Sequence, residues 1–200
     1  MPGSGCILLL NGTSSSGKTS LAKAVQVALP RQYLHVQLNA FRDMEPVGYF
    51  SRTQAESGPL RVAALCRAMH ATVAEFAGHG QNVIFDHVLS DEAWHYLFED
   101  FREQTLYLVG VHCAVEELVR RERARGDREH GLAESQVGQI HENREYDFSV
   151  DTSHSNPTEC AHALVHWLLQ APAPSAFKRM RVRHHAAYPF YRDSAQPERA

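Results

Sequence analysis

The chain has 200 residues, of which 44% are hydrophobic and 22% are charged, values close to those of ordinary globular proteins. This balance excludes a disordered chain, a fibrous repeat and a coiled coil. No apolar run approaches the roughly 20 residues that span a bilayer. The 20 basic and 23 acidic residues give a net charge of −3, which excludes a chain that binds polyanions through its overall charge.

The cysteines and the N-terminus indicate the compartment. The four cysteines lie far apart and form no C-x-x-C pair, a pattern typical of buried thiols in a reducing environment. The first residues lack the basic lead of a secretory signal peptide. We therefore expect a cytoplasmic protein with no membrane and no nucleic-acid partner.

The first half of the sequence alternates strand and helix patterns. Residues 6–10 form a continuous apolar run, which is typical of a strand buried on both faces of a parallel sheet. Proline and glycine residues between Pro46 and Pro59 predict a loop-rich stretch. The other elements expected here are a helix at 20–29, a strand at 33–38, a helix at 60–77 and a strand at 83–85.

The second half continues the alternation. Ser90 is a good N-cap for a helix, and Asn156, followed by Pro157 and Glu159, predicts a second capped helix that runs to about Gln170. The other elements expected are a strand at 105–111, a helix at 114–125, a polar segment at 127–136 leading into a further helix, and a strand at 146–150. Strands that alternate with helices predict an α/β fold, a parallel sheet with helices on both faces.

The sequence changes character at Ala171. Alanines and prolines come first, and basic residues with Tyr188, Phe190 and Tyr191 follow. We interpret 171–200 as a basic, aromatic-containing extension of a domain at 1–170. It is either a mobile or surface-draped segment or an arm for docking or self-association, which would give a homo-oligomer.

A phosphate-binding loop follows the first strand. The stretch G-T-S-S-S-G-K-T at 12–19 fits the pattern G-x-x-x-x-G-K-[ST]. Such a loop points backbone N–H groups at a phosphate chain, the lysine reaches the β- and γ-phosphates, and the hydroxyl binds Mg²⁺. A buried strand before it and a helix after it supply the required context. The residues expected to bind the nucleotide are Gly12, Thr13, Ser14, Ser15, Ser16, Gly17, Lys18, Thr19 and Ser20.

Two further sets of side chains fit phosphoryl transfer. Asp86 ends an apolar strand, the position from which P-loop enzymes supply a carboxylate to the Mg²⁺; its alternative role is a helix cap or a hydrogen-bonded loop residue. Arginines cluster between Arg120 and Arg128. They either form a solvated helix face or, as a lid around 114–137, neutralise the transferring phosphoryl group.

Several stretches resemble the chloramphenicol 3-O-phosphotransferase family of P-loop small-molecule kinases. They are the loop with its strand (9–19), V-G-V-H-C at 109–113, A-R-G-D-R at 124–128, E-Y-D at 145–147 and V-D-T at 150–152. The similarity runs from about Ile7 to Leu169.

The resemblance implies a fold like that of the nucleoside monophosphate kinases and transfer of the γ-phosphoryl group of ATP to an alcohol. It also implies that Arg121, Arg125 and Arg128 belong to the lid and that 151–153 lie near the nucleotide base. No motif separates ATP from GTP.

One departure from the family concerns the general base. Where the family has an aspartate at the end of the second strand, this sequence has Asn39, and a neutral amide cannot accept the proton of a hydroxyl as a carboxylate can. Asp43 could take the role instead. Alternatively, transfer proceeds without a strong base, or the protein binds its ligands without efficient transfer.

The expected function is that of a kinase acting on a small hydroxylated molecule. Aromatic side chains suited to an antibiotic or a nucleoside-like acceptor are expected at Phe41, Tyr49, Phe50 and Trp94. The alternatives are a metabolic or toxin-type kinase of a sugar or nucleotide sugar, and a nucleotide-dependent binding module.

Overall fold

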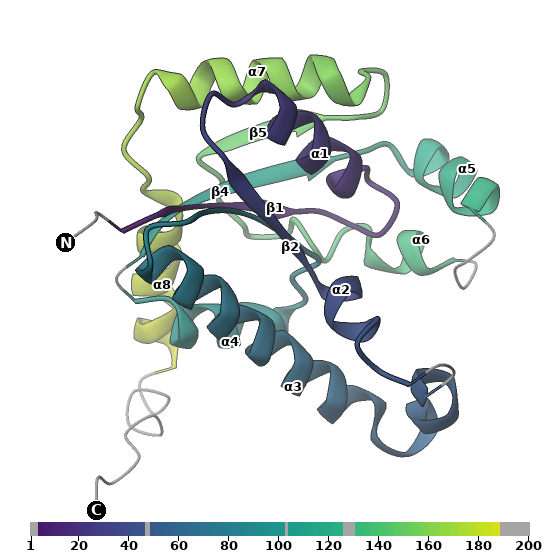
Figure 1. Ribbon diagram of the computed structural model, residues 1–200. Helices are drawn as coiled ribbons and strands as arrows, with labels where there is room; N and C mark the ends of the chain where they lie inside the picture. The colour runs from purple at the N-terminus through teal and green to yellow at the C-terminus, as the bar shows by residue number, and fades with distance from the viewer. Residues whose placement is uncertain (1–3, 47–48, 103, 126–130, 189–200) are drawn as a thin grey trace, which may run out of the picture.

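The structure is a computed structural model that describes residues 4–46, 49–102, 104–125 and 131–188. The side chains of 49–59 and of Arg125 lie outside the description. Figure 1 shows a central sheet between two layers of helices. The predicted α/β architecture is therefore confirmed.

The sheet has five strands, all parallel, in the order β2-β3-β1-β4-β5. β1 lies in the centre, where Ile7 pairs with Val83 on one side and with Leu106 on the other. Because every strand runs the same way, all five carboxyl ends lie at one edge. The strands are β1 (Cys6–Asn11), β2 (Tyr33–Gln37), β3 (Asn82–His87), β4 (Thr105–His112) and β5 (Phe148–Asp151).

Successive β1 side chains enter two separate cores, because the side chains of a strand alternate between faces. Ile7 and Leu9 lie in one core, whereas Leu8 and Leu10 lie in the other. The helices divide between these faces (Figure 1). α1 (Lys18–Ala28) and α7 (Pro157–Leu169) cover one face, and α3 (Tyr49–Gly78), α4 (Asp91–Asp100) and α8 (Ala176–Ala187) cover the other.

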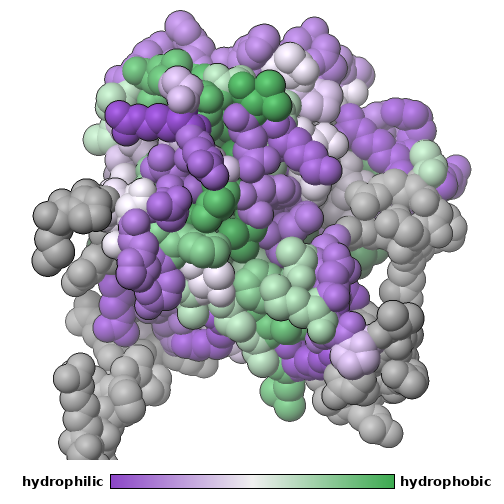
Figure 2. Space-filling view, viewed as in Figure 1, coloured by the Kyte–Doolittle hydropathy of each residue, from purple (hydrophilic) through white to green (hydrophobic). Residues whose placement is uncertain are grey.

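Some large apolar side chains are exposed on the surface. In Figure 2, hydrophobic residues gather in the middle of the visible face and hydrophilic residues cover most of the rest. Met44 and Leu60 are among the exposed large hydrophobic residues. Within the described residues, no helix is long and apolar enough to cross a membrane.

The prediction of a loop up to Pro59 was wrong, because α3 begins at Tyr49 and runs through this residue. A proline inside a helix removes one backbone hydrogen bond and its ring clashes with the carbonyl four residues earlier, which together cost about 3 kcal/mol or more. Further along the same helix, Cys66, Met69 and Val73 are buried in the molecule. Their burial stabilises the helix as a whole, so the proline within it does not end the helix.

Two short helices flank the site and were not predicted. α2 (Leu38–Arg42) follows β2 directly, and α6 (Leu132–Gln136) lies within the polar segment that was expected to lead into a further helix. The longer helix expected after 136 is absent from the described chain, where turns lead instead to β5. α5 (Val115–Arg125) agrees with its prediction.

The segment after Ala171 is not simply draped over the surface. Ala176, Phe177 and Met180 of α8 are buried against the core of the α3–α4 face. Asp147 holds the start of this helix, because its Oδ1 accepts hydrogen bonds from the backbone N–H groups of Ser175 (2.8 Å) and Ala176 (2.9 Å). The surface-draped interpretation was therefore wrong for 176–187, and 189–200 lie outside the described residues.

Candidate active site

The phosphate-binding loop joins β1 to α1 at the carboxyl edge of the sheet. Ser15 (φ +61°) and Gly17 (φ +89°) have left-handed backbone conformations that turn the chain. At Gly12, an added Cβ would lie 2.4 Å from the Val111 carbonyl oxygen, so only glycine fits there. The turn places backbone N–H groups around the start of α1, an arrangement that binds phosphate.

Lys18 is held inside the loop. Its side chain is buried, and its Nζ donates hydrogen bonds to the backbone oxygens of Gly12 (3.0 Å) and Thr13 (2.7 Å). The ammonium group thus lies at the mouth of the loop, where a phosphate chain would meet it. The role of Lys18 as a phosphate ligand stays a prediction.

Thr19 and Asp86 form the second part of the site. The Thr19 hydroxyl donates to Asp86 Oδ2 at 2.7 Å, and His35 Nε2 lies 3.5 Å from the same oxygen. Burial acts to raise the pKa of Asp86, but its interactions with His35, Lys18 and Thr19 outweigh this effect and lower the pKa. Asp86 therefore stays ionised. Its carboxylate oxygen and the hydroxyl oxygen of Thr19 together suit Mg²⁺.

No group of three or more His, Cys, Asp or Glu side chains in the described parts of the chain could hold a metal ion by itself. A magnesium ion at Thr19 and Asp86 would therefore need further ligands. In phosphoryl-transfer enzymes the nucleotide phosphates and water supply them. The donor set fits a cation that arrives with the nucleotide.

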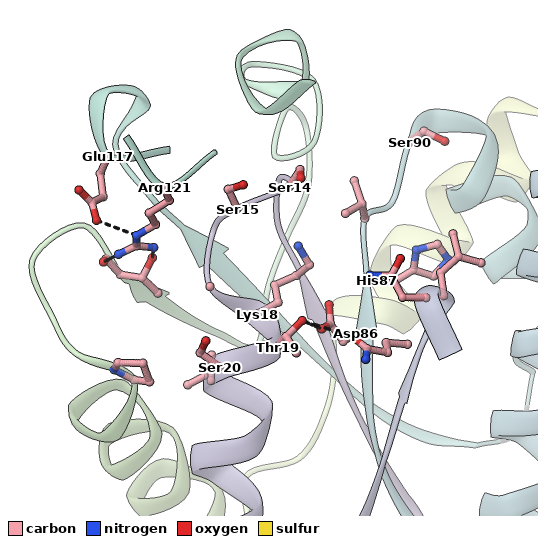
Figure 3. A pocket seen from close by; sticks show the side chains of 18 of the residues that line it. Ser14, Ser15, Lys18, Thr19, Ser20, Asp86, His87, Ser90, Glu117 and Arg121 are labelled. Carbon is pink, nitrogen blue, oxygen red and sulfur yellow. Dashed lines mark hydrogen bonds and ion pairs between the residues drawn. The ribbon is translucent and has the colours of Figure 1, made fainter. Parts of the chain in front are cut away.

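These groups line a cavity of about 630 Å³ that extends to both sides of Lys18. In Figure 3, Glu117 and Arg121 lie on one side of Lys18, and His87 and Ser90 lie on the other. The side beyond the loop is lined by Glu117, Arg120, Arg121, Ala124, Thr152, Ser155 and Pro157. The opposite side is lined by Gln37, Leu38, Asn39, Arg42, Val62, Cys66, His87, Val88, Ser90 and Ala93.

Arg121 is the predicted lid arginine that the structure places at the cavity wall. Its Nη2 donates to the Thr152 carbonyl oxygen (2.6 Å), and its Nε donates to Glu117 Oε1 (2.7 Å). Arg120 also binds Glu117, and hydrogen bonds from Arg120 and Arg121 lower the pKa of this partly buried carboxylate to about 2. The side chain of Arg125 and all of Arg128 lie outside the described residues.

Thr152 connects the end of β5 to the loop. Its hydroxyl donates to the Ser16 carbonyl oxygen at 2.8 Å. An added Cβ on Gly17 would lie 3.4 Å from Arg121 Nη1 and 3.8 Å from Thr152 Oγ1. Thr152 therefore lies beside the phosphate-binding loop, and the position of 151–153 near the nucleotide base stays a prediction.

The residues expected to surround the acceptor molecule lie in different parts of the structure. Asn39 lines the cavity, whereas Asp43 is exposed and absent from the lining that the structure describes. Trp94 is 1% exposed and belongs to the core, so its predicted place in the pocket was wrong. Phe41 packs against the same core. The side chains of Tyr49 and Phe50 lie outside the described residues.

Sequence reasoning missed several cavity residues. His87 follows Asp86, is buried, and has its pKa lowered to about 3 by burial and by the neighbouring His70. Arg42 and Cys66 come from α2 and α3. Periodicity indicated α3 but not which of its residues face the cavity, and the five-residue α2 was too short to detect.

The parallel sheet, the loop and the Thr19–Asp86 pair define a P-loop kinase. Solved structures of other kinases share the fold, and two serve as examples. An APS kinase of Mycobacterium tuberculosis in complex with AMPPNP and APS has a TM-score of 0.59 at 16% identity, covering 84% of this chain and 99% of that one. A gluconokinase of Sinorhizobium meliloti has a TM-score of 0.56 at 18% identity, covering 94% and 99%.

The sequence matches the family of chloramphenicol phosphotransferase-like proteins over residues 5–168, and the chain belongs to this family. A candidate O-phosphotransferase of Mycobacterium tuberculosis is 31% identical over 204 aligned positions, covering 90% of this chain and 89% of the relative. The chain is thus an O-phosphotransferase with the P-loop kinase fold, and the resemblance noted in the sequence is confirmed.

Proposed function

We propose that this enzyme transfers the γ-phosphoryl group of ATP to a hydroxyl of a small antibiotic or nucleoside-like molecule in the cytoplasm. One observation carries the proposal. Lys18 and the Thr19–Asp86 pair share a single cavity with a compartment that reaches Asn39. A triphosphate and a drug-sized acceptor can therefore meet within one cavity.

The loop side of the cavity suits the nucleotide. Lys18 and the loop N–H groups would hold the phosphates, and Thr19 and Asp86 would hold Mg²⁺, which neutralises charge on the phosphates when bound. Arg120 and Arg121 lie on the wall beyond the loop. Among the described arginines, these two are best placed to compensate the negative charge of the phosphates. Arg125 and Arg128 remain proposed lid residues.

The reaction would depend on positioning more than on a strong base. Among the described lining residues, Asp86 and Glu117 are the only carboxylates, and both already accept hydrogen bonds. Asn39 can orient the acceptor hydroxyl but cannot take its proton. Phosphoryl transfer through a loose transition state relies mainly on alignment and charge stabilisation, so an amide at this position is compatible with turnover.

The acceptor side combines aliphatic and polar groups. Leu38, Val62, Val88 and Ala93 provide apolar surface, which suits an antibiotic or a nucleoside-like compound. The guanidinium of Arg42 lines the same side. This residue favours a second candidate, an acceptor with an anionic group such as a nucleotide sugar.

The test measures nucleoside diphosphate release from ATP and from GTP with Mg²⁺ across antibiotics, nucleosides, sugars and nucleotide sugars, with mass spectrometry of each acceptor. Lys18→Ala is the matched blank. An acceptor that gains one phosphate only with the unmodified protein supports the proposal. Tight nucleotide binding without phosphorylation of any acceptor would favour the binding module instead.

A further inference from the structure

Gln37 ends β2 directly beside Asp86. In the parallel pairing of β2 with β3, these two residues lie opposite each other, and residues so paired point to the same face of a sheet. Both side chains meet the Thr19 hydroxyl, whose oxygen lies 2.7 Å from Asp86 Oδ2 and 3.3 Å from Gln37 Oε1. Three side-chain oxygens from three elements therefore gather at the carboxyl edge of the sheet.

The spacing of these oxygens suits ligands of one magnesium ion. Mg²⁺ binds oxygen octahedrally at about 2.0–2.1 Å, so neighbouring ligand oxygens lie about 3 Å apart. The distances from Thr19 Oγ1 to Asp86 Oδ2 (2.7 Å) and to Gln37 Oε1 (3.3 Å) lie on either side of this value. The carbonyl oxygen of an amide is, like a carboxylate, a hard ligand that suits Mg²⁺.

The Gln37 oxygen is held weakly by its protein neighbours. A hydroxyl has one proton to donate, and the shorter contact of the Thr19 hydroxyl is the one with Asp86. Within the described parts of the chain, the contact with Thr19 is the only hydrogen bond of the Gln37 side chain. Gln37, Asp86 and Thr19 all line the cavity, whereas His35, which also approaches Asp86, is absent from its described lining.

We propose that the side-chain oxygen of Gln37 is a further protein ligand of the magnesium ion that accompanies the nucleotide, beside Thr19 and Asp86. The inference rests on the proposed function, in which this site takes a nucleotide with Mg²⁺. The protein ligands would then carry one negative charge, that of Asp86. Asn39, two residues after Gln37, lines the same cavity, so the ion would be held at the end of the nucleotide site nearest to the acceptor side.

The test measures binding of Mn²⁺, a paramagnetic probe for Mg²⁺, to the full chain saturated with ADP. Gln37→Leu removes the oxygen and keeps a side chain of similar size. Loss of a side chain that orients a metal ligand lowers metal affinity about 10- to 100-fold. Because water can replace the amide oxygen, we expect the Kd of Mn²⁺ to rise by the lower value, about 10-fold. Broadening of the Mn²⁺ electron paramagnetic resonance signal by ¹⁷O-labelled water should show one more water ligand in this variant.

Binding of ADP without a metal ion separates this role from a structural one. In the presence of EDTA, the Kd of ADP should be the same for Gln37→Leu and for the unmodified protein. Gln37→Glu restores an oxygen at this position and should keep the number of water ligands found with the unmodified protein. Gln32→Leu is the matched control, because Gln32 is exposed at the opposite end of β2.

The outcomes distinguish this inference from the proposed function. An unchanged Kd of Mn²⁺ and an unchanged number of water ligands in Gln37→Leu overturn the role of Gln37 alone. An equal rise in the Kd of ADP with and without the metal ion also overturns it. If the unmodified protein binds ADP but no Mn²⁺ with it, the metal role of Thr19 and Asp86 fails too. If it binds neither, the proposed function is overturned as well.

Discussion

At the scale of single residues, the site depends on the charge of Asp86. Asp86→Asn keeps the shape and can still accept the Thr19 hydrogen bond, but it removes the anion that would face Mg²⁺. Since loss of one preorganised electrostatic group lowers turnover about 100- to 1,000-fold, we expect kcat/KM to fall by at least about 100-fold. The Mg²⁺ concentration for half-maximal rate should rise, as measured in a steady-state assay.

Asp43→Asn is the matched control for this variant. Asp43 is exposed on the surface next to α2, so its loss should leave kcat within about twofold if transfer proceeds without a strong base. A fall in kcat of about 100-fold for Asp43→Asn would instead identify it as the general base. Full activity of Asp86→Asn would contradict the role given to Asp86.

The residues of the loop could be predicted from sequence because their chemistry is local. Gly12, Lys18 and Thr19 lie within one short stretch, and Asp86 directly follows an apolar run. Gln136 could not be predicted in this way, and Thr152 was indicated only by the family resemblance of 150–152. They reach the loop across more than a hundred residues of sequence, and a glutamine or threonine in a polar segment carries no signal of its own.

At the scale of elements, α8 is expected to contribute to stability. Phe177 is 5% exposed, and its ring lies 5.6 Å from that of Phe98 on α4, centre to centre. Phe177→Ala should lower the free energy of unfolding by about 3–5 kcal/mol, because it removes apolar contacts and leaves a cavity. Urea-induced unfolding, followed by circular dichroism, provides the measurement.

Val182→Ala is the comparison within the same helix. Val182 is 68% exposed, and substitutions at such positions change stability by no more than about 0.5 kcal/mol. If the two variants unfolded at the same urea concentration, α8 would not be part of the folded core in solution.

The strands and most helices could be predicted because burial imposes a regular pattern on their sequences. The β1 run is apolar throughout since helices cover both faces of the sheet. α8 lacked such a signal. Its basic residues dominate the composition, and only three of its twelve residues are buried. The sequence pattern therefore predicts an exposed segment. α2 and α6, at five residues each, are too short for a helical period to repeat.

At the scale of the whole molecule, partly buried histidines make stability depend on pH. Burial and the charge of His112 lower the pKa of His141 to about 4, and burial and His95 lower that of His184 to about 4. An unfolded histidine titrates near 6.5. Between these values the unfolded chain binds more protons than the folded one, so stability falls as the pH decreases from 6.5 toward 4.

We expect the free energy of unfolding to fall by roughly 1 kcal/mol per such histidine between pH 7 and pH 5. The carboxylates with lowered pKa values change the stability only below about pH 4.5, because the pKa values of carboxyl groups in the unfolded chain lie below this pH. His141→Gln should flatten the dependence, whereas His162→Gln, at an exposed position on α7, should not. Identical pH profiles for His141→Gln and the unmodified protein would refute this account.

The order of strands in space differs from their order along the chain, which affects how the protein folds during synthesis. β1 leaves the ribosome first, yet its neighbours β3 and β4 begin only at Asn82 and Thr105. An apolar strand must therefore wait unpaired until β3 (Asn82–His87) has been translated, at roughly 5–20 residues per second. Long-range parallel pairing of this kind is slow. The same central strand that presents the loop is thus prone to aggregation until its neighbouring strands are made.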